Sequence, residues 1–499
     1  MTLKSRLKAL NPKLKALNPK LKAPKIELKA LRPTLTLALL LLLTACTANK
    51  QLRTDPLGEY CEVNGSDCTQ AVIERYPDHD LGFIEFTERG NLYDRESLNE
   101  VLRLVKRQSE SEHGAAVFVF VHGWKHNARH DDSNVVQFRE FLSRAAENEV
   151  VGRRKVIGLY LGWRGAFTEV PVLKEATYWA RKSVAEEVGA GGATEVFAKL
   201  HQILVAQPAK QLVVSESGSL QQSEKYKNSF VIIGHSFGGA IVLSALHDVL
   251  LNNLVAANTS ISNEPQRCDQ VSRFADALIL LNPAIEANKV VLLKEAAARC
   301  LFQEDQPPLM HVLSSDGDNA TKVFFPMGQY LNIASPLGPK KLKRSVQGKE
   351  IVLDERKLGL VTAGNLRQLR TSYLKYDKSD SNWLLSKCSD DLSSCGLNGS
   401  KQQRNHFTVN QYDPLRFIKT DRVFIKNHND AFGCYVQGFI SSLVMQAQSV
   451  DLGFNQKDSP QSNLSSTQEH NACAHSDGEK FNLMGCFNRQ IEEYDCELP

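Results

Sequence analysis

The sequence predicts an α/β fold with a mostly parallel central sheet flanked by helices. Short apolar runs of strand length alternate with stretches of helical length along most of the chain. Several of these runs are apolar at every position, which is typical of parallel strands covered on both faces. The chain has 499 residues and an ordinary hydrophobic fraction of 42%, so it can bury a large core.

The expected elements begin near residue 82. The strands are Gly82–Phe86, Ala115–Val121, Val156–Leu161, Phe230–Ile233, Ala277–Leu281, Leu309–Leu313 and Val423–Ile425. The helices are Arg95–Arg107, Phe138–Ala146, Ala240–Leu251 and Ala431–Met445. Two segments, near 166–225 and 335–415, are expected to be cap-like insertions.

This pattern places one large domain at residues 81–446. Residues 46–80 are polar and are expected to form a tether with a small disulfide loop. Residues 447–499 are expected to be a polar, cysteine-containing tail.

The amino end has the pattern of a secretory signal peptide at residues 1–45. A basic stretch is followed by the apolar run Thr34–Leu43. A membrane-spanning helix needs roughly 20 apolar residues, and this run is shorter. The next residues, Leu43-Thr44-Ala45-Cys46, resemble the lipobox of bacterial lipoproteins.

That resemblance implies cleavage before Cys46 and acylation of this cysteine, so that the mature chain is anchored to the cell envelope. Multiple acyl chains give stable attachment. Thr47, rather than Asp, follows the cysteine, which in Gram-negative lipoproteins implies the outer membrane, facing the periplasm. The alternative is an ordinary signal peptide with a cysteine there by chance.

The charge and the cysteines narrow the functional classes. Ten basic residues and one acidic residue lie in the first 33 positions, so the remainder of the chain is acidic despite the overall net charge of +4. No nucleic-acid partner is therefore expected. Without Cys46 there are ten cysteines, an even number that suggests disulfides in an exported protein. Cys61 with Cys68 and Cys388 with Cys395 would close short loops.

No metal or cofactor is expected either. A metal site is the rival explanation for the cysteines, but the sequence contains no CxxC pair and no HExxH helix.

Ser236 is the candidate nucleophile. It lies in Gly234-His235-Ser236-Phe237-Gly238, between an apolar strand and an apolar helix. A serine hydroxyl needs an exposed position and a neighbouring base to become nucleophilic. The sharp strand-to-helix turn of a G-x-S-x-G motif supplies that exposure, and its glycines relieve the crowding.

The oxyanion of an acyl-transfer intermediate needs backbone N–H groups that already point at it. One donor should be the N–H of Phe237, the residue after the nucleophile. The second is expected from Trp124, in the His122-Gly123-Trp124 turn after an earlier strand. For His122 itself, a hydrogen bond that fixes the loop is favoured over direct catalysis.

Together these residues resemble the α/β-hydrolase superfamily over roughly residues 80–445. The similarity is greatest to bacterial esterase-like members with a His-Gly-Trp turn and a Gly-Trp-Arg-Gly segment, here at 162–165. The resemblance implies the order oxyanion loop, serine, acid, histidine. His428, after the last expected strand, is then the base, with His406 as a competitor inside the polar insertion.

The acid should follow the strand at 309–313. Both Asp316 and Asp318 qualify, and Asp318 is favoured because the family acid commonly lies a few residues into that loop. Asp beside glycine is also a common turn residue, which is the expected fate of the other. Arg164 and Asn282 are weaker candidates for substrate binding, with a structural ion pair and a turn as their respective alternatives.

The function expected from the resemblance is hydrolysis of a small-molecule or lipid carboxylic ester through an acyl-enzyme. The same three residues could serve a thioesterase, peptidase or acyltransferase, because fold does not separate these activities. A non-catalytic envelope lipoprotein that reuses the fold is a further alternative.

Overall fold

The structure, a computed structural model, describes the chain from Lys50 onward with several gaps. The described ranges are 50–55, 68–148, 151–166, 178–205, 211–214, 220–223, 228–258, 265–304, 306–332, 341–346, 349–388, 407, 412–451 and 482–497. All of them belong to one compact unit. The expected signal peptide, Cys46, Cys61, Cys395 and His406 lie outside the described residues.

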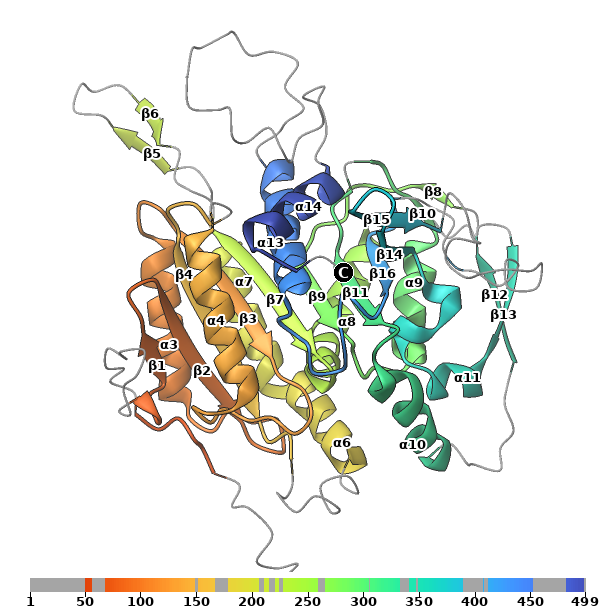
Figure 1. Cartoon of the computed structure of the whole chain (residues 1–499), viewed down its shortest axis with the longest axis horizontal. Helices are drawn as coiled ribbons and strands as arrows, with labels where there is room; N and C mark the ends of the chain where they lie inside the picture. Colours follow the sequence, from red (N-terminus) through yellow and green to blue (C-terminus); the bar gives the residue numbers. More distant parts are fainter. Residues whose placement is uncertain are drawn as a thin grey trace, which may run out of the picture. The chain divides into compact units, whose positions relative to one another are not determined.

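A ten-stranded sheet in the order β1-β2-β4-β3-β7-β9-β11-β16-β14-β15 forms the centre of this unit. Only the two edge strands, β1 and β15, pair antiparallel with their neighbours. The predicted mostly parallel α/β architecture is therefore confirmed (Figure 1). The strands are β1 (Ile73–Arg75), β2 (His79–Phe86), β3 (Ala115–Val121), β4 (Lys155–Trp163), β7 (Ser229–His235), β9 (Ala277–Leu281), β11 (Met310–Ser315), β14 (Ser372–Asp377), β15 (Asn382–Lys387) and β16 (Leu415–Thr420).

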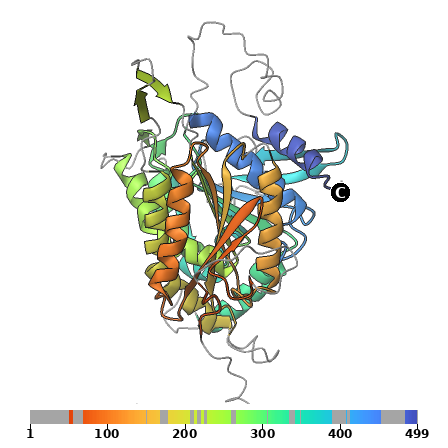
Figure 2. The same cartoon turned by 90° about the vertical axis from the view of Figure 1, so that its left-hand side faces the viewer.

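Helices cover both faces of the sheet (Figure 2). Side chains alternate along a strand, so Phe230 and Ile232 of β7 join one core cluster while Val231 and Ile233 join the other. The first cluster includes α3 (Arg95–Ser109), α7 (Thr194–Leu204) and α8 (Phe237–Ala256). The second includes α4 (Ser133–Glu147), α13 (Cys434–Asp451) and α14 (Leu483–Glu493).

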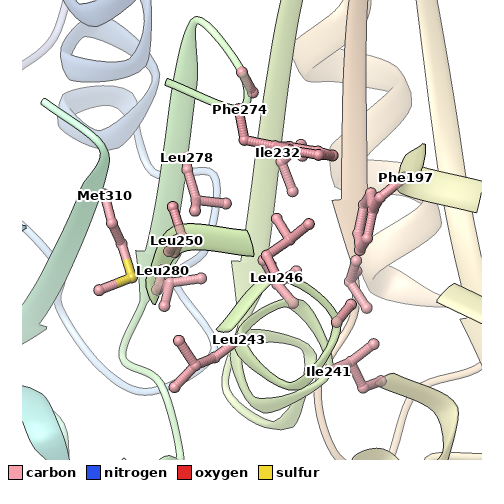
Figure 3. Packing of buried hydrophobic residues seen from close by; sticks show 14 of the residues in the cluster. Phe197, Ile232, Ile241, Leu243, Leu246, Leu250, Phe274, Leu278, Leu280 and Met310 are labelled. Atoms are coloured by element: carbon pink, nitrogen blue, oxygen red, sulfur yellow. The ribbon is translucent and has the colours of Figure 1, made fainter. Parts of the chain in front are cut away.

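Helix α8 packs deepest on the first face. Leu243, Leu246 and Leu250 lie against Ile232 of β7 and Leu280 of β9 (Figure 3). Among the described residues it is also the one helix long and apolar enough to cross a membrane, and half of that apolar window is buried in the fold. Its apolar surface is that of a core helix.

Six of the seven predicted strands are confirmed to within three residues at either end. The seventh is wrong, because residues 423–425 form a turn and the strand lies earlier, at Leu415–Thr420. Phe424 and Ile425 are nevertheless buried, which explains the apolar run there.

The two expected insertions contribute to the body of the fold. In the first, α6 (Tyr178–Val188) and α7 pack against α8, and Val188, Val196, Phe197 and Leu200 are fully buried. In the second, β14 and β15 extend the central sheet beyond β16. The described parts of the two expected cap-like insertions therefore also belong to the layers of the central α/β fold. The remaining elements are η2 (Gly189–Ala193), α9 (Val291–Ala297), η4 (Ala320–Phe324), α10 (Phe325–Asn332), α11 (Glu355–Leu360), η3 (Ala287–Val290), η5 (Ala363–Asn365), η6 (Arg367–Leu369) and the short strand pairs β5 (Gln211–Val214) with β6 (Leu220–Ser223), β8 (Gln266–Arg267) with β10 (Cys300–Leu301), and β12 (Lys341–Val346) with β13 (Lys349–Asp354).

The segments expected as tether and tail also differ from their predictions where they are described. Arg53 is buried and pairs with the buried Glu74 of β1 at 2.8 Å. At the other end, α14 packs on α13, and a Cys434–Cys496 disulfide joins the two helical segments.

Disulfides also form elsewhere in the chain. Cys268 bonds to Cys300. Cys68, Cys388 and Cys486 are disulfide-bonded as well, but their pairings, including the two predicted short loops, lie outside the described residues.

Candidate active site

The turn between β7 and α8 holds Ser236 in a strained backbone conformation. Its φ is 57° and its ψ is −118°, a region that non-glycine residues rarely occupy. The surroundings maintain it, since the Ser236 N–H donates to the carbonyl of Leu281 at 3.0 Å and its carbonyl accepts from Ala284 N–H at 3.0 Å. The serine is thereby fixed where a parallel strand gives way to a helix, at the carboxyl edge of the sheet.

Close packing explains the glycines of this turn. A Cβ on Gly238 would lie 1.9 Å from the carbonyl oxygen of Val121, at the end of β3. A Cβ on Gly234 would lie 2.8 Å from the Cα of Gly239. Only glycine allows the first turn of α8 to approach both β3 and its own strand this closely.

Ser236, His428 and Asp318 form a continuous hydrogen-bonded series. The Nε2 of His428 lies 2.7 Å from the Ser236 Oγ, and its Nδ1 lies 3.0 Å from the Asp318 Oδ1. Because an ionised carboxylate only accepts, Nδ1 carries the proton and Nε2 accepts from the serine hydroxyl. This is the relation of nucleophile, base and orienting acid that acyl transfer requires.

Asp318 is fully buried and well supplied with donors. Its Oδ1 also accepts from the N–H of Ala320 at 2.9 Å, and its Oδ2 accepts from the Thr321 hydroxyl. Burial alone would raise the pKa of Asp318, but the hydrogen bonds from His428 and Thr321 outweigh it and hold the pKa below its ordinary value. The carboxyl is therefore ionised at neutral pH.

Asp316, the alternative acid, faces a different set of partners. Its carboxylate lies 3.2 Å from the Lys419 Nζ and accepts from the Tyr373 hydroxyl at 2.9 Å. Burial would raise the pKa of Asp316, but Lys419 and Tyr373 lower it overall. The geometry thus favours Asp318 as the partner of His428 and makes Asp316 the counter-ion of a buried lysine.

The loops that carry Asp318 and His428 contact each other directly. The hydroxyl of Ser315, at the end of β11, donates to the carbonyl of Ile425 at 2.7 Å. A Cβ on Gly317 would lie 2.5 Å from the Lys426 carbonyl oxygen. Although the predicted strand before His428 was misplaced, these contacts bring the histidine to the expected edge of the sheet.

The predicted oxyanion donors lie beside the nucleophile. A Cβ on Gly123 would lie 2.8 Å from the Cβ of Ser236, so glycine lets this loop reach the serine. In the part of the chain that the structure describes, no hydrogen bond uses the N–H of Trp124 or of Phe237. Both donors remain available to a ligand, and their catalytic role remains a prediction.

Two motifs singled out in the sequence hold the oxyanion loop together. His122 accepts from the N–H of Trp163 at 3.1 Å and donates through Nδ1 to the Gly123 carbonyl at 2.9 Å. The N–H of Lys125 donates to the Gly165 carbonyl at 3.0 Å. Burial lowers the pKa of His122 to about 4, so the ring is neutral. These contacts agree with the expected structural role of His122.

The two weaker substrate-binding candidates lie in structural contacts. Arg164 is mostly buried and lies 3.5 Å from Glu88, a carboxylate shared with Arg181. Asn282 is fully buried, has a φ of 42°, and accepts from the Ser315 N–H at 2.9 Å. Both observations favour the structural alternatives considered for these residues.

His235 is a residue that motif reasoning passed over. Its Nε2 lies 2.6 Å from the backbone carbonyl oxygen of His428, and a carbonyl only accepts, so the ring donates. Burial and the nearby His428 lower the pKa of His235 to about 3, which keeps it neutral. It ties the segment of the base to the residue before the nucleophile. The sequence feature that could have indicated this role is the position of His235 inside the G-x-S-x-G motif.

Tyr178 is a second such residue. Its ring lies 4.8 Å from that of Phe237 and 5.0 Å from that of Trp124, measured between centroids. It therefore packs against the side chains of both residues that carry the proposed oxyanion donors, although it comes from the first insertion.

In comparisons with protein-family models, with curated proteins and with solved structures, no match to this chain was found.

Proposed function

We propose that this chain is a serine hydrolase of the α/β-hydrolase superfamily that cleaves carboxylic esters through an acyl-enzyme. The observation that carries the proposal is the Ser236–His428–Asp318 series, with links of 2.7 and 3.0 Å. The strained conformation of Ser236 between a parallel strand and a helix supports it further.

The geometry suggests the following acylation step. The Ser236 Oγ attacks the ester carbonyl carbon while the Nε2 of His428 takes the hydroxyl proton. The carbonyl oxygen becomes negative and is stabilised by the N–H groups of Trp124 and Phe237. The bond to the alcohol oxygen then breaks, and the proton on Nε2 passes to that oxygen.

Deacylation repeats the step with water. Water attacks the acyl carbon and gives its proton to His428, which returns it to Ser236 as the carboxylic acid leaves. Asp318 holds the imidazole in the required orientation and stabilises it while it is positively charged. The ionised, buried carboxylate is suited to that task.

The test uses a fluorophosphonate probe and short-chain 4-nitrophenyl esters. The wild-type chain should be labelled and should turn over the ester, whereas Ser236→Ala should lose labelling and about 10⁴-fold or more of kcat/KM. Circular dichroism should show that the variant is folded. Full activity of Ser236→Ala would refute the mechanism, and parallel thioester and amide substrates would reveal a different acyl donor.

We also propose that the protein is exported and lipid-anchored at Cys46. Incorporation of labelled palmitate in a bacterial host should occur in the wild-type chain and be absent in Cys46→Ser. Equal incorporation in both would contradict the anchor. Loss of the anchor should leave hydrolysis of soluble esters unchanged, because the proposed mechanism uses Ser236, His428 and Asp318 and does not involve Cys46.

A further inference from the structure

The chain enters the described fold at the edge of the sheet that carries the active site. The N–H groups of Leu52 and Arg53 donate to the carboxylate of Glu85, at 2.9 and 2.7 Å. Glu85 is next to the last residue of β2, beside Gly162 near the end of β4. β2, β4 and β7 run parallel, so their ends and Ser236 share one edge.

Several side-chain contacts of Arg53 hold this first described segment in place. The Arg53 side chain is 1% exposed, donates to the Ala128 carbonyl at 2.7 Å, and pairs with Glu74. Its guanidinium also lies 3.7 Å from the centre of the Phe83 ring. Ala128 belongs to the loop that follows the proposed oxyanion turn. The hydrogen bonds of residues 52 and 53 to Glu85 and Ala128 therefore hold this segment on the side of the domain that carries the active site.

The proposed anchor is close to this point in the sequence. Leu52 lies six positions after Cys46, and six fully extended Cα–Cα steps span at most about 20 Å. An acylated Cys46 would therefore keep Leu52, which is bound at the carboxyl end of β2, within that distance of the lipid headgroups.

The same edge carries an exposed apolar patch. The side chains of Val323, Phe324 and Met327 are 43%, 65% and 64% exposed, and we call them the α10 patch. They lie five to nine residues after Asp318, on the helical segment η4–α10. Figure 1 shows α10 and α6 projecting at the same end of the domain. Exposed apolar side chains that cluster mark an interaction surface more often than scattered ones do.

We infer that the active-site edge faces the bilayer that holds the anchor, that the α10 patch contacts this bilayer, and that the substrate is an ester of a membrane lipid. The inference rests on the proposed function and names its substrate class. The short anchor limits which side of the protein can meet the membrane, and the patch supplies the apolar contact on that side.

The orientation can be measured without using catalysis. Lipidated full-length Phe324→Trp and Val255→Trp variants are placed in vesicles that contain brominated phospholipids, which quench tryptophan on contact. Val255 is 56% exposed, but it lies at the far end of α8 from Ser236, about 28 Å along the helix. Quenching, relative to the wild type, should be several-fold greater for Phe324→Trp. Equal quenching in the two variants would overturn the inference.

Activity provides the second test. The double variant Phe324→Ser/Met327→Ser should hydrolyse a soluble 4-nitrophenyl butyrate within about twofold of the wild type, but should lose at least tenfold on a fluorogenic phospholipid ester in vesicles. The matched control Val205→Ser/Val255→Ser replaces two exposed valines far from the site and should change neither rate.

The outcomes separate the two proposals. A wild-type protein that cleaves the soluble ester but not the vesicle lipid overturns the substrate class and leaves the proposed function standing. Equal loss on both substrates in the patch variant also overturns the inference, because the patch would then act on the site itself. Inactivity on both substrates, together with no probe labelling of Ser236, would instead refute the proposed function.

Discussion

At the residue scale, the sequence predicts a single residue for the proposed nucleophile but only a pair of candidates for the proposed acid. Ser236 is identified by its own neighbours, because the motif, the preceding strand and the following helix are contiguous. Asp316 and Asp318 differ in partners that come from distant positions. The carboxylate of Asp316 contacts Lys419 and Tyr373, whereas that of Asp318 contacts His428. The residues next to the two aspartates in the sequence do not indicate which of them contacts the histidine.

Substituting each aspartate separately tests the assignment. Asp318→Asn should lower kcat by about 10⁴-fold, because the amide favours the wrong histidine tautomer. Asp316→Asn should keep kcat within about tenfold, since this side chain serves Lys419. Michaelis constants and rates on a soluble ester provide the measurement. The reverse ranking would make Asp316 the acid.

His235 allows a sharper test of how the base is positioned. His235→Ala removes the donor to the His428 carbonyl and should lower kcat by about 10 to 100-fold with little change in KM, because a misplaced base affects mainly the chemical step. In His235→Gln the amide nitrogen can replace Nε2 and should restore much of the rate, whereas the shorter His235→Asn should not. Equal rates in all three variants would show that this hydrogen bond does not position the base.

At the scale of secondary-structure elements, buried strands in which every residue is apolar could be predicted from the sequence. Buried strands that contain both apolar and charged residues could not. β16 reads Leu-Arg-Phe-Ile-Lys-Thr, and its two charges argue against a buried strand. In the structure the positive charge of the buried Lys419 is compensated by an ion pair with Asp316 and a hydrogen bond to the Asn365 carboxamide. That compensation depends on β11 and on the second insertion, so it cannot be seen in β16 alone.

The C-terminal helices provide a prediction at this scale. The Cys434–Cys496 disulfide closes a loop of 62 residues, and such a loop contributes about 4 kcal/mol in the chain-entropy model. Cys434→Ser/Cys496→Ser should therefore lower the free energy of unfolding by about 2–4 kcal/mol, measured by urea denaturation. No change in the urea midpoint would mean that α14 is held by packing alone.

At the scale of the whole molecule, buried neutral histidines contribute to the expected response to acid. Burial lowers the pKa of His122 to about 4 and, with added repulsion from His428, that of His235 to about 3. Burial and the neighbouring Arg416 lower the pKa of His311 to about 3. Unfolded histidine titrates near 6.5, so below that pH the unfolded chain binds more protons than the folded one.

Stability should therefore fall as the pH is lowered from about 6.5 to 4. Each of these histidines contributes a slope of up to about 1.4 kcal/mol per pH unit in that window. Urea unfolding at pH 7, 6 and 5 measures the effect, and His311→Gln should make the loss of stability with falling pH shallower. A free energy of unfolding that is constant or rises toward pH 5 would contradict the expectation.

The three residues of the site are widely spaced along the chain, and His428 lies 192 positions after Ser236. This spacing has a consequence for a chain that crosses a membrane from its amino end, as the proposed signal peptide implies. Ser236 and the proposed oxyanion loop would emerge first, and His428, the proposed base, would follow only after β16. Under the proposed mechanism, hydrolytic competence would therefore be acquired late in translocation, when every strand of the described sheet has already crossed the membrane.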